Sequence, residues 1–221
     1  MNLKPIIWPL LVLLVLAVGV RADNPPPPAA PAPASAVGNG DFSQWENPPA
    51  WLPPKMDCTQ VPTGWFIVPA EPAHASALAR DIEVKHAGDC SLRLSNTNTN
   101  SGVSVAQRVP VQDEMRYVIR LWVKGEKIDD YYPKGVNVLL VPSSSDNMKD
   151  GNGWAGNLGE SYKPPPSVRG SFDWCQLVAT IDMPKGAKTM FMTIFLGGAG
   201  TFWVSEVSLT PLEKCLQVES Y

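Results

Sequence analysis

The feature that most constrains the fold is a block of three apolar-alternating segments within residues 172–209. In its first segment Leu177, Ala179 and Ile181 share one parity, and mostly polar residues take the positions between them. A period of two is typical of a strand with one buried face. Pro-Lys-Gly and Gly-rich breaks separate the segments, because proline lacks a backbone donor and glycine permits positive φ. The block therefore predicts three consecutive strands joined by tight turns.

The same alternation recurs through most of the chain, and no amphipathic helix of convincing length interrupts it. Short strands at close spacing without helices between them favour an antiparallel sandwich over a parallel sheet. We therefore expect an all-β fold, an antiparallel two-sheet β-sandwich of the jelly-roll type. In the last strand Trp203, Val207 and Leu209 are expected to share a face. The other expected strands cover residues 37–42, 65–68, 81–86, 91–95, 103–111, 115–124 and 135–141.

Several short motifs follow one another in a recognisable order. They are Asn39-Gly40-Asp41-Phe42, Pro62-Thr63-Gly64-Trp65, Ser91-Leu92-Arg93, the strand Tyr117 to Lys124, and Gly200-Thr201-Phe202-Trp203 leading to Val207-Ser208-Leu209. This series resembles the CenC-type, galactose-binding-like jelly-roll modules attached to cellulases and xylanases, over roughly residues 37–212. The resemblance implies a non-catalytic module that recognises a polysaccharide or oligosaccharide.

The two ends of the chain differ in composition from its middle. Residues 1–22 combine Lys4, an apolar run and small residues at a cleavage position, which is typical of an export signal. The run is shorter than the roughly 20 residues of a membrane span. Residues 23–36 are rich in proline and alanine and predict a semi-rigid linker. We expect a secreted or cell-envelope (periplasmic) protein with its domain at 37–212, a tail at 213–221 and no stable membrane span after signal removal.

The formal net charge of the chain limits the class of partner that it can bind. Removing residues 1–22 takes away Lys4 and Arg21 and changes the formal net charge from −3 by two units to −5. A net negative domain argues against nucleic acid or an anionic membrane as the partner. Carbohydrate is the expected partner, and no cofactor is required.

The sequence contains four cysteines: Cys58, Cys90, Cys175 and Cys215. An even number in an exported chain predicts two disulfides, with three pairings open. Cys90 and Cys175 share parity with apolar neighbours at strand starts, so we favour Cys90–Cys175 and Cys58–Cys215. The alternative is that one pair stays reduced and packs as small apolar side chains.

Sugars are recognised by aromatic faces and by planar polar side chains that bond hydroxyl groups. Trp122 has the outward parity of its strand, and it shares that face with Arg120. The alternative is that arginine merely shields the indole. Trp174 is similarly ambiguous, whereas Trp65 and Trp203 are expected in the core.

A long, polar insertion at 143–170 carries Trp154 and Tyr162, and such a loop tends to carry function. Either ring could instead anchor the loop. Asn137 and Gln176 are candidate hydrogen-bonding partners, although each also fits an ordinary solvated strand face. We expect the sugar across the Trp122 face, edged by this loop.

The resemblance also implies a structural calcium between the opening and last strands, at Asp41, Ser43 and Glu206, with backbone oxygens near Asn39. Calcium prefers six to eight oxygen ligands. Here Ser43 replaces a usual glutamate, and Ser205-Glu206 replaces a usual pair of aspartates. A structural calcium is therefore one expectation. The alternative is that disulfides stabilise the fold in its place.

Catalysis has little support in the sequence. The histidines are His74 and His86, and His86 has the parity of a buried core histidine. No nucleophile, metal-protease or phosphate-loop motif occurs. Two other functions remain open: an envelope-associated structural or adhesion module that binds a protein, and a small glycan-active hydrolase.

Overall fold

The computed structural model describes residues 34–50, 52, 56–69, 76–129, 135–149, 156–158 and 168–212. In this part of the chain every regular element is a strand, and no helix has the length and hydropathy needed to cross a membrane. The strands are β1 (Trp45–Glu46), β2 (Val61–Pro62), β3 (Phe66–Pro69), β4 (Ser76–Asp81), β5 (Ser91–Asn96), β6 (Gly102–Pro110), β7 (Arg116–Ile128), β8 (Gly135–Ser143), β9 (Gly170–Asp182), β10 (Thr189–Gly197) and β11 (Gly200–Leu212).

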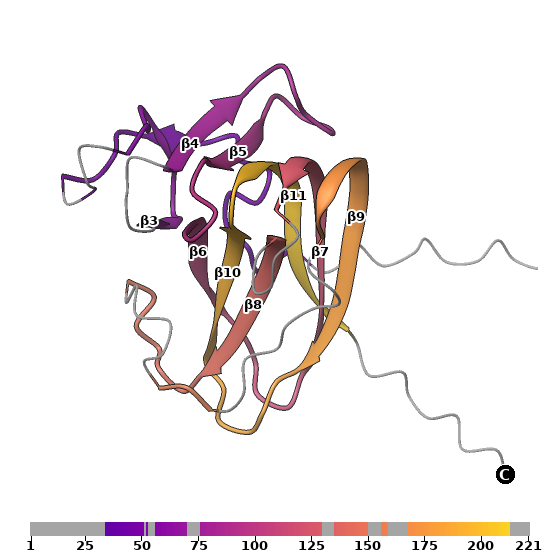
Figure 1. Ribbon diagram of the computed structural model, residues 1–221. Helices are drawn as coiled ribbons and strands as arrows, with labels where there is room; N and C mark the ends of the chain where they lie inside the picture. Colours follow the sequence, from indigo (N-terminus) through magenta and orange to yellow (C-terminus); the bar gives the residue numbers. More distant parts are fainter. Residues whose placement is uncertain are drawn as a thin grey trace, which may run out of the picture. The chain divides into compact units, whose positions relative to one another are not determined.

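Two antiparallel sheets form the sandwich (Figure 1). One has the order β3-β6-β10-β8 and the other the order β4-β5-β11-β7-β9, while β1 and β2 form a separate two-stranded sheet. The strands that follow one another from β9 to β11 alternate between the two sheets, which is the pattern of a jelly roll. The predicted all-β sandwich is confirmed.

The core lies between the inner faces of the two sheets, and the alternation of the sequence decides which side chains enter it. On β10, Met190, Met192 and Ile194 are fully buried, and they face Ile119 and Leu121 of β7 as parts of one apolar cluster. The residues between them point outward, away from this cluster. Each sheet therefore presents an outer face whose side chains are set by the opposite parity.

The segment before β1 completes the pairing of β11. β5 accompanies β11 only as far as Val204. Beyond it, Ala36 N donates to Leu209 O at 2.9 Å and Val207 N donates to Gly40 O at 2.8 Å. Ser35 Oγ also accepts a bond from Leu209 N at 3.1 Å. The predicted strand at 37–42 is wrong, because these residues form turns that supply single hydrogen bonds to β11.

A β-bulge divides β11. The register with β7 shifts between Ser205 and Ser208, and Glu206 has a φ of 53°. An extra residue reverses the side-chain parity beyond it. Trp203 therefore lies on the outer face, whereas Val207 and Leu209 enter the core cluster. The prediction that these three share a face is wrong for that reason, although Trp203 is buried as expected.

The predicted strand at 81–86 is also displaced. β4 ends at Asp81, and residues 82–89 form a loop. Asp81 Oδ1 accepts bonds from Glu83 N at 3.0 Å and Val84 N at 2.9 Å, which turns the chain away from the sheet. Ile82, which the alternation placed inward, is 57% exposed.

The predicted disulfides are not formed in the described part of the chain: Cys58, Cys90 and Cys175 are free. Cys90 precedes β5 and Cys175 lies on β9, with β11 and β7 between those strands. Three strand spacings are about 14 Å, and a disulfide needs Cα atoms within about 7 Å. The pairing Cys90–Cys175 is therefore wrong, although both residues pack on the core. Cys215 lies outside the described residues.

The contact between Gly40 and β11 leads to a stability prediction. A Cβ on Gly40 would lie 2.0 Å from Val207 O, whereas a Cβ on Gly38 would meet nothing closer than 3.8 Å. Overpacking against backbone costs about 1–3 kcal/mol or more. We expect Gly40→Ala to lower the midpoint of urea unfolding clearly and Gly38→Ala to leave it nearly unchanged. Equal effects would show that this contact does not support the fold.

Candidate binding faces of the two sheets

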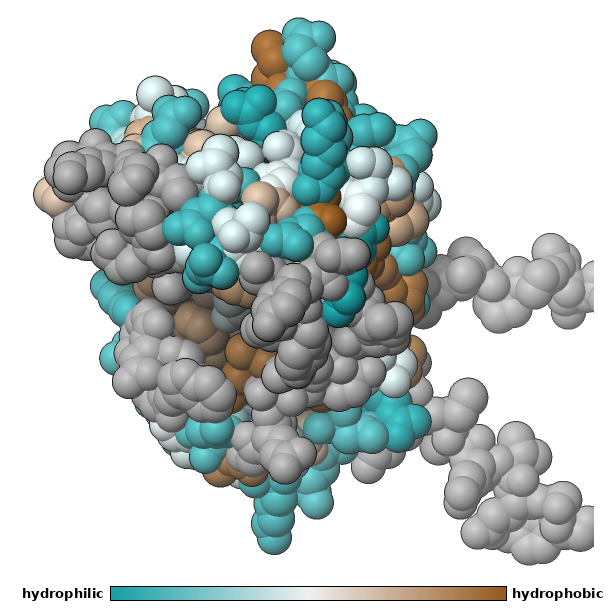
Figure 2. Space-filling model, viewed as in Figure 1, coloured by the Kyte–Doolittle hydropathy of each residue, from teal (hydrophilic) through white to brown (hydrophobic). Residues whose placement is uncertain are grey.

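The outer face of the four-stranded sheet is largely apolar. We call it the Phe191 face; it comprises Phe66, Ser104, Ala106, Arg108, Asn137, Leu139, Val141, Phe191, Thr193 and Phe195, which share the outward parity in the paired registers. Phe66 and Phe191 stack with centroids 6.3 Å apart and an interplanar angle of 24°. Figure 2 shows apolar residues recessed at the centre of the view, over β6, β10 and β8.

Arg108 is the one charged residue of this set, and it is only 2% exposed. Its guanidinium carbon lies 5.4 Å from the centroid of Phe191, which is within cation–π range. Its Nη1 donates to Thr189 Oγ1 at 3.0 Å. Phe191, Ala106 and Val141 are buried as well, so the centre of this face is packed. Its half-buried residues include Phe66, Leu139, Thr193 and Phe195.

A pocket of about 510 Å³ opens beside Phe66. Its wall combines aromatic and aliphatic groups with an acidic, an amide and a basic side chain. The residues are Glu46, Asn47, Pro49, Val61, Gly64, Trp65, Phe66, Ile67, Met148 and Lys149. This volume is within the range of about 300–1,000 Å³ for small-molecule sites.

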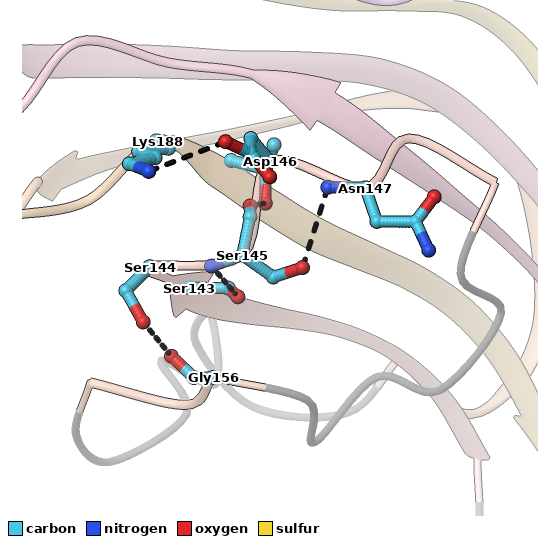
Figure 3. Close-up of polar contacts among 8 residues, drawn as sticks. Ser143, Ser144, Ser145, Asp146, Asn147, Gly156 and Lys188 are labelled. Atoms are coloured by element: carbon cyan, nitrogen blue, oxygen red, sulfur yellow. Dashed lines mark hydrogen bonds and ion pairs between the residues drawn. The ribbon is translucent and has the colours of Figure 1, made fainter.

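The beginning of the 143–170 insertion is built from serine-capped turns at the end of β8 (Figure 3). Ser143 Oγ accepts a bond from Ser145 N at 3.0 Å, and Ser144 Oγ donates to Gly156 O at 3.3 Å. Asp146 pairs with Lys188 at 3.2 Å. A bond from Lys188 holds the pKa of Asp146 below its usual value. This part of the insertion is therefore anchored to β8 and to the chain just before β10.

The described remainder of the insertion stays near the same strand. Asn157 forms a bridge with Ser143, and Val168 forms one with Val136. A Cβ on Gly156 would lie 2.9–3.0 Å from three atoms of Ser143–Ser145, and its φ is 65°, so glycine is required at this return. The described residues up to Val168 thus adjoin β8 and the four-stranded sheet, whereas Gly170 begins β9 of the five-stranded sheet.

A second cavity, of about 430 Å³, lies on the outer face of the five-stranded sheet. We call it the Trp122 hollow. It is lined by Ser35, Val37, Gly40, Asp41, Arg120, Trp122, Gln176, Glu206, Val207 and Ser208. β7 and β9 contribute the outward-pointing residues, while the bulge of β11 and the segment before β1 contribute the rim.

An aromatic stack stands beside this hollow. The imidazole of His86 lies on the indole of Trp122, with centroids 3.8 Å apart and an angle of 14°. Trp174 meets His86 edge-on at 5.6 Å. His86 Nδ1 is 2.5 Å from Glu206 Oε2, and because a carboxylate can only accept, Nδ1 carries the proton. His86 is therefore a surface residue with three partners, and its prediction as a core histidine is wrong.

Asp81 holds the base of the loop that carries His86. Besides its two backbone bonds, it accepts a bond from Trp203 Nε1 at 2.9 Å and lies 3.9 Å from Arg93. Burial alone would raise the pKa of Asp81, but the bonds from Val84 and Trp203 outweigh it, so the pKa is below its usual value. The charged form is thus favoured in the folded protein.

The structure brings together some predicted site residues and separates others. Trp122, Arg120 and Gln176 line one hollow. Asn137 lies on the Phe191 face, on the other sheet. Trp154, Tyr162 and His74 lie outside the described part of the chain. The predicted combination of the Trp122 face with the 143–170 insertion therefore stays a prediction.

Sequence reasoning missed the Phe191 face and the role of His86. Phe66, Phe191 and Phe195 alternate with core residues, so their outward parity was readable from the strands. The stack of His86 on Trp122 had no local signal, because it joins a loop to a strand far away in the sequence.

The structure places two of the predicted calcium ligands together, since Asp41 and Glu206 line the same hollow. Asp41 Oδ1 accepts bonds from Ser43 N and Oγ, and Glu206 Oε2 is bound to His86. In the described ranges no group of three or more histidine, cysteine or acidic side chains could hold a metal. The predicted set also included Ser43 and backbone oxygens, so a structural calcium stays a prediction.

No family model matches the sequence, and no curated protein is significantly similar to it. Solved structures do resemble the fold. A putative sugar binding protein from Bacteroides thetaiotaomicron has a TM-score of 0.53 at 15% identity, over 80% of this chain and 100% of that one. The enzymatically active domain of bacteriophage CBA120 tailspike protein 4 has a TM-score of 0.56 at 10% identity, over 80% of this chain but only 21% of that one.

The CBM22-1 xylan-binding domain from Paenibacillus barcinonensis Xyn10C also matches, at a TM-score of 0.44 and 14% identity, over 85% of this chain and 100% of that one. At these identities the comparisons establish a shared β-sandwich fold and nothing finer. The CenC-type family suggested by the motifs stays a prediction.

Asp81 gives a testable pH dependence. Its lowered folded-state pKa means that its contribution to stability is present above the unfolded pKa, about 3.9, and is lost as the pH falls through the folded value. We expect Asp81→Asn to lower the free energy of unfolding by about 1–2 kcal/mol at pH 7, through weakened charge-assisted bonds. Urea titrations at pH 7 and pH 3 should show the difference shrinking at pH 3.

Asp182→Asn is the matched control. Asp182 bonds Arg116 at 2.6 Å but its side chain is 68% exposed, so solvent screens the pair. A loss in Asp182→Asn as large as in Asp81→Asn would contradict the role assigned to the Asp81 bonds.

Proposed function

We propose that this protein is a non-catalytic module that binds a polysaccharide or oligosaccharide at the Phe66 edge of the Phe191 face, in the pocket beside Phe66. The observation that carries the proposal is the stacked pair Phe66–Phe191, which lies beside a pocket of about 510 Å³ with mixed polar and apolar walls. Phe66 belongs to both and is half-buried, whereas Phe191 is buried, so the sugar would pack on Phe66.

The chemistry of this face suits a sugar. The C–H face of a pyranose packs on an aromatic ring, and its hydroxyl groups need donors and acceptors at the edge. Phe66 supplies the ring, while Asn47, Glu46 and Lys149 supply polar groups within the pocket. Asn137 lies further along the same face, opposite Phe195 in the register. A rigid apolar floor with a polar rim is the usual design of a ligand site.

Two further features support the proposal. The motifs of the sequence resemble carbohydrate-binding modules, and a solved structure of similar fold is described as a putative sugar binding protein. The signal-like residues 1–22 and the Pro/Ala segment fit a secreted or envelope protein that displays its domain to extracellular glycans.

Retention on polysaccharide gels tests the proposal. We expect the full chain to be retarded on at least one gel containing xylan, β-glucan or galactan, and Phe66→Ala or Met148→Ala to weaken retention about tenfold or more, as loss of a central contact does. Ile82→Ala is the control, because Ile82 is an exposed apolar residue outside the pocket.

Measurements on the same samples also distinguish the proposed function from an adhesion module and from a hydrolase. Retardation that is unchanged in both pocket variants would show that the sugar does not bind in the pocket beside Phe66. No retardation on any glycan, together with specific capture of one envelope protein, would favour the adhesion module. Release of reducing ends from the gels would favour a hydrolase, since Asp41 and Glu206 share a hollow on the other sheet.

A further inference from the structure

The Trp122 hollow has the features of a second binding site. We propose that it binds a single ring, or a chain end, of a neutral hydroxyl-rich sugar, independently of the Phe191 face. The two sites would lie on the outer faces of opposite sheets, because Trp122 is on β7 and Phe191 is on β10. One domain could then contact two glycan segments.

The first argument is that Trp122 is held in one orientation. His86 covers one side of the indole at 3.8 Å, and His86 is in turn fixed by Glu206 and by the edge of Trp174. The hollow is lined by Trp122 but not by His86 or Trp174, so the stack flanks the hollow without filling it. A ring preorganised in this way loses little side-chain entropy when a ligand packs on it.

The second argument is the unused hydrogen-bonding capacity around the hollow. Within the described residues, the guanidinium of Arg120 makes one weak bond, to Thr210 Oγ1 at 3.4 Å. The amide of Gln176 is exposed and has no protein partner there. Asp41 uses Oδ1 and Glu206 uses Oε2, which leaves the second oxygen of each carboxylate. Donors and acceptors that flank an indole match the alternating hydroxyl groups of a sugar.

The charge and the volume of the Trp122 hollow limit the class of ligand that it can bind. Two carboxylates and one guanidinium line the hollow, so an anionic sugar would meet net repulsion. The volume of about 430 Å³ is at the lower end of the range for small-molecule sites. Both points favour a short neutral saccharide over a long or acidic one.

His86 acts in this proposal as a positioning residue, since it supports Trp122 without lining the hollow. Substituting alanine removes the stack, whereas phenylalanine keeps a ring against the indole and loses only the bond to Glu206. An aromatic stack contributes about 0.5–1.5 kcal/mol. We therefore expect His86→Ala to weaken binding in the hollow about two- to tenfold and His86→Phe to restore most of it.

The experiment is a titration of the ¹⁵N-labelled full chain, followed by the indole N–H signals of its tryptophans. The probes are xylohexaose, cellohexaose and galactotriose, each with the methyl glycoside of its monomer. Phe66→Ala serves as the background that removes the other site. We expect the Trp122 indole signal to shift with at least one probe in this background, and Gln176→Ala to reduce that shift.

The outcomes distinguish the two sites. A Trp122 shift in Phe66→Ala that is weakened by His86→Ala and restored by His86→Phe supports the second site. Signals that shift only near Phe66, in the unsubstituted chain, would overturn the second site and leave the proposed function standing. Shifts only at Trp122 would support sugar binding in the hollow and would overturn sugar binding at the Phe191 face. If no signal shifts with any probe, the hollow is not a sugar site.

Discussion

The short contact between the segment before β1 and the end of β11 is the constraint on which much of the molecule depends. β5 leaves β11 at Val204, and the last strand would otherwise expose unpaired backbone groups on that side. Residues 35–40 satisfy some of them, and Gly40 allows the approach because it has no side chain. The same contact brings Asp41 to the rim of the Trp122 hollow, beside the bulge that turns Glu206 outward.

The bulge and the Asp81 turn have related effects. Each interrupts the regular alternation of a strand in the five-stranded sheet, and each changes the direction in which a nearby side chain points. The bulge directs Glu206 toward His86, and the Asp81 turn releases the loop that carries His86 over β7. Local breaks in strand geometry therefore build the aromatic stack, as is common at functional positions of β-sheets. The four-stranded sheet is regular, and its outer face is shaped by side-chain parity alone.

The sequence was sufficient for the fold class. Alternation predicted strands close to β6, β7, β9 and β10, and the outward positions of Trp122, Arg120 and Gln176 were read correctly. It failed where one residue changed the register, at Glu206, and where a polar side chain stopped a strand, at Asp81. It also failed for Cys90 and Cys175, because inward parity does not reveal how many strands separate two residues.

The sequence by itself determined the all-β class, the strand periodicity and the identity of the residues that face outward, because a period of two is a local property of the backbone. The tertiary structure decided which sheet each strand joins. Strand order depends on pairings between distant segments, and it alone placed Asn137 and the beginning of the 143–170 insertion on one side of the sandwich and Trp122 on the other. The same long-range pairing brought His86 onto Trp122, which no local pattern could specify.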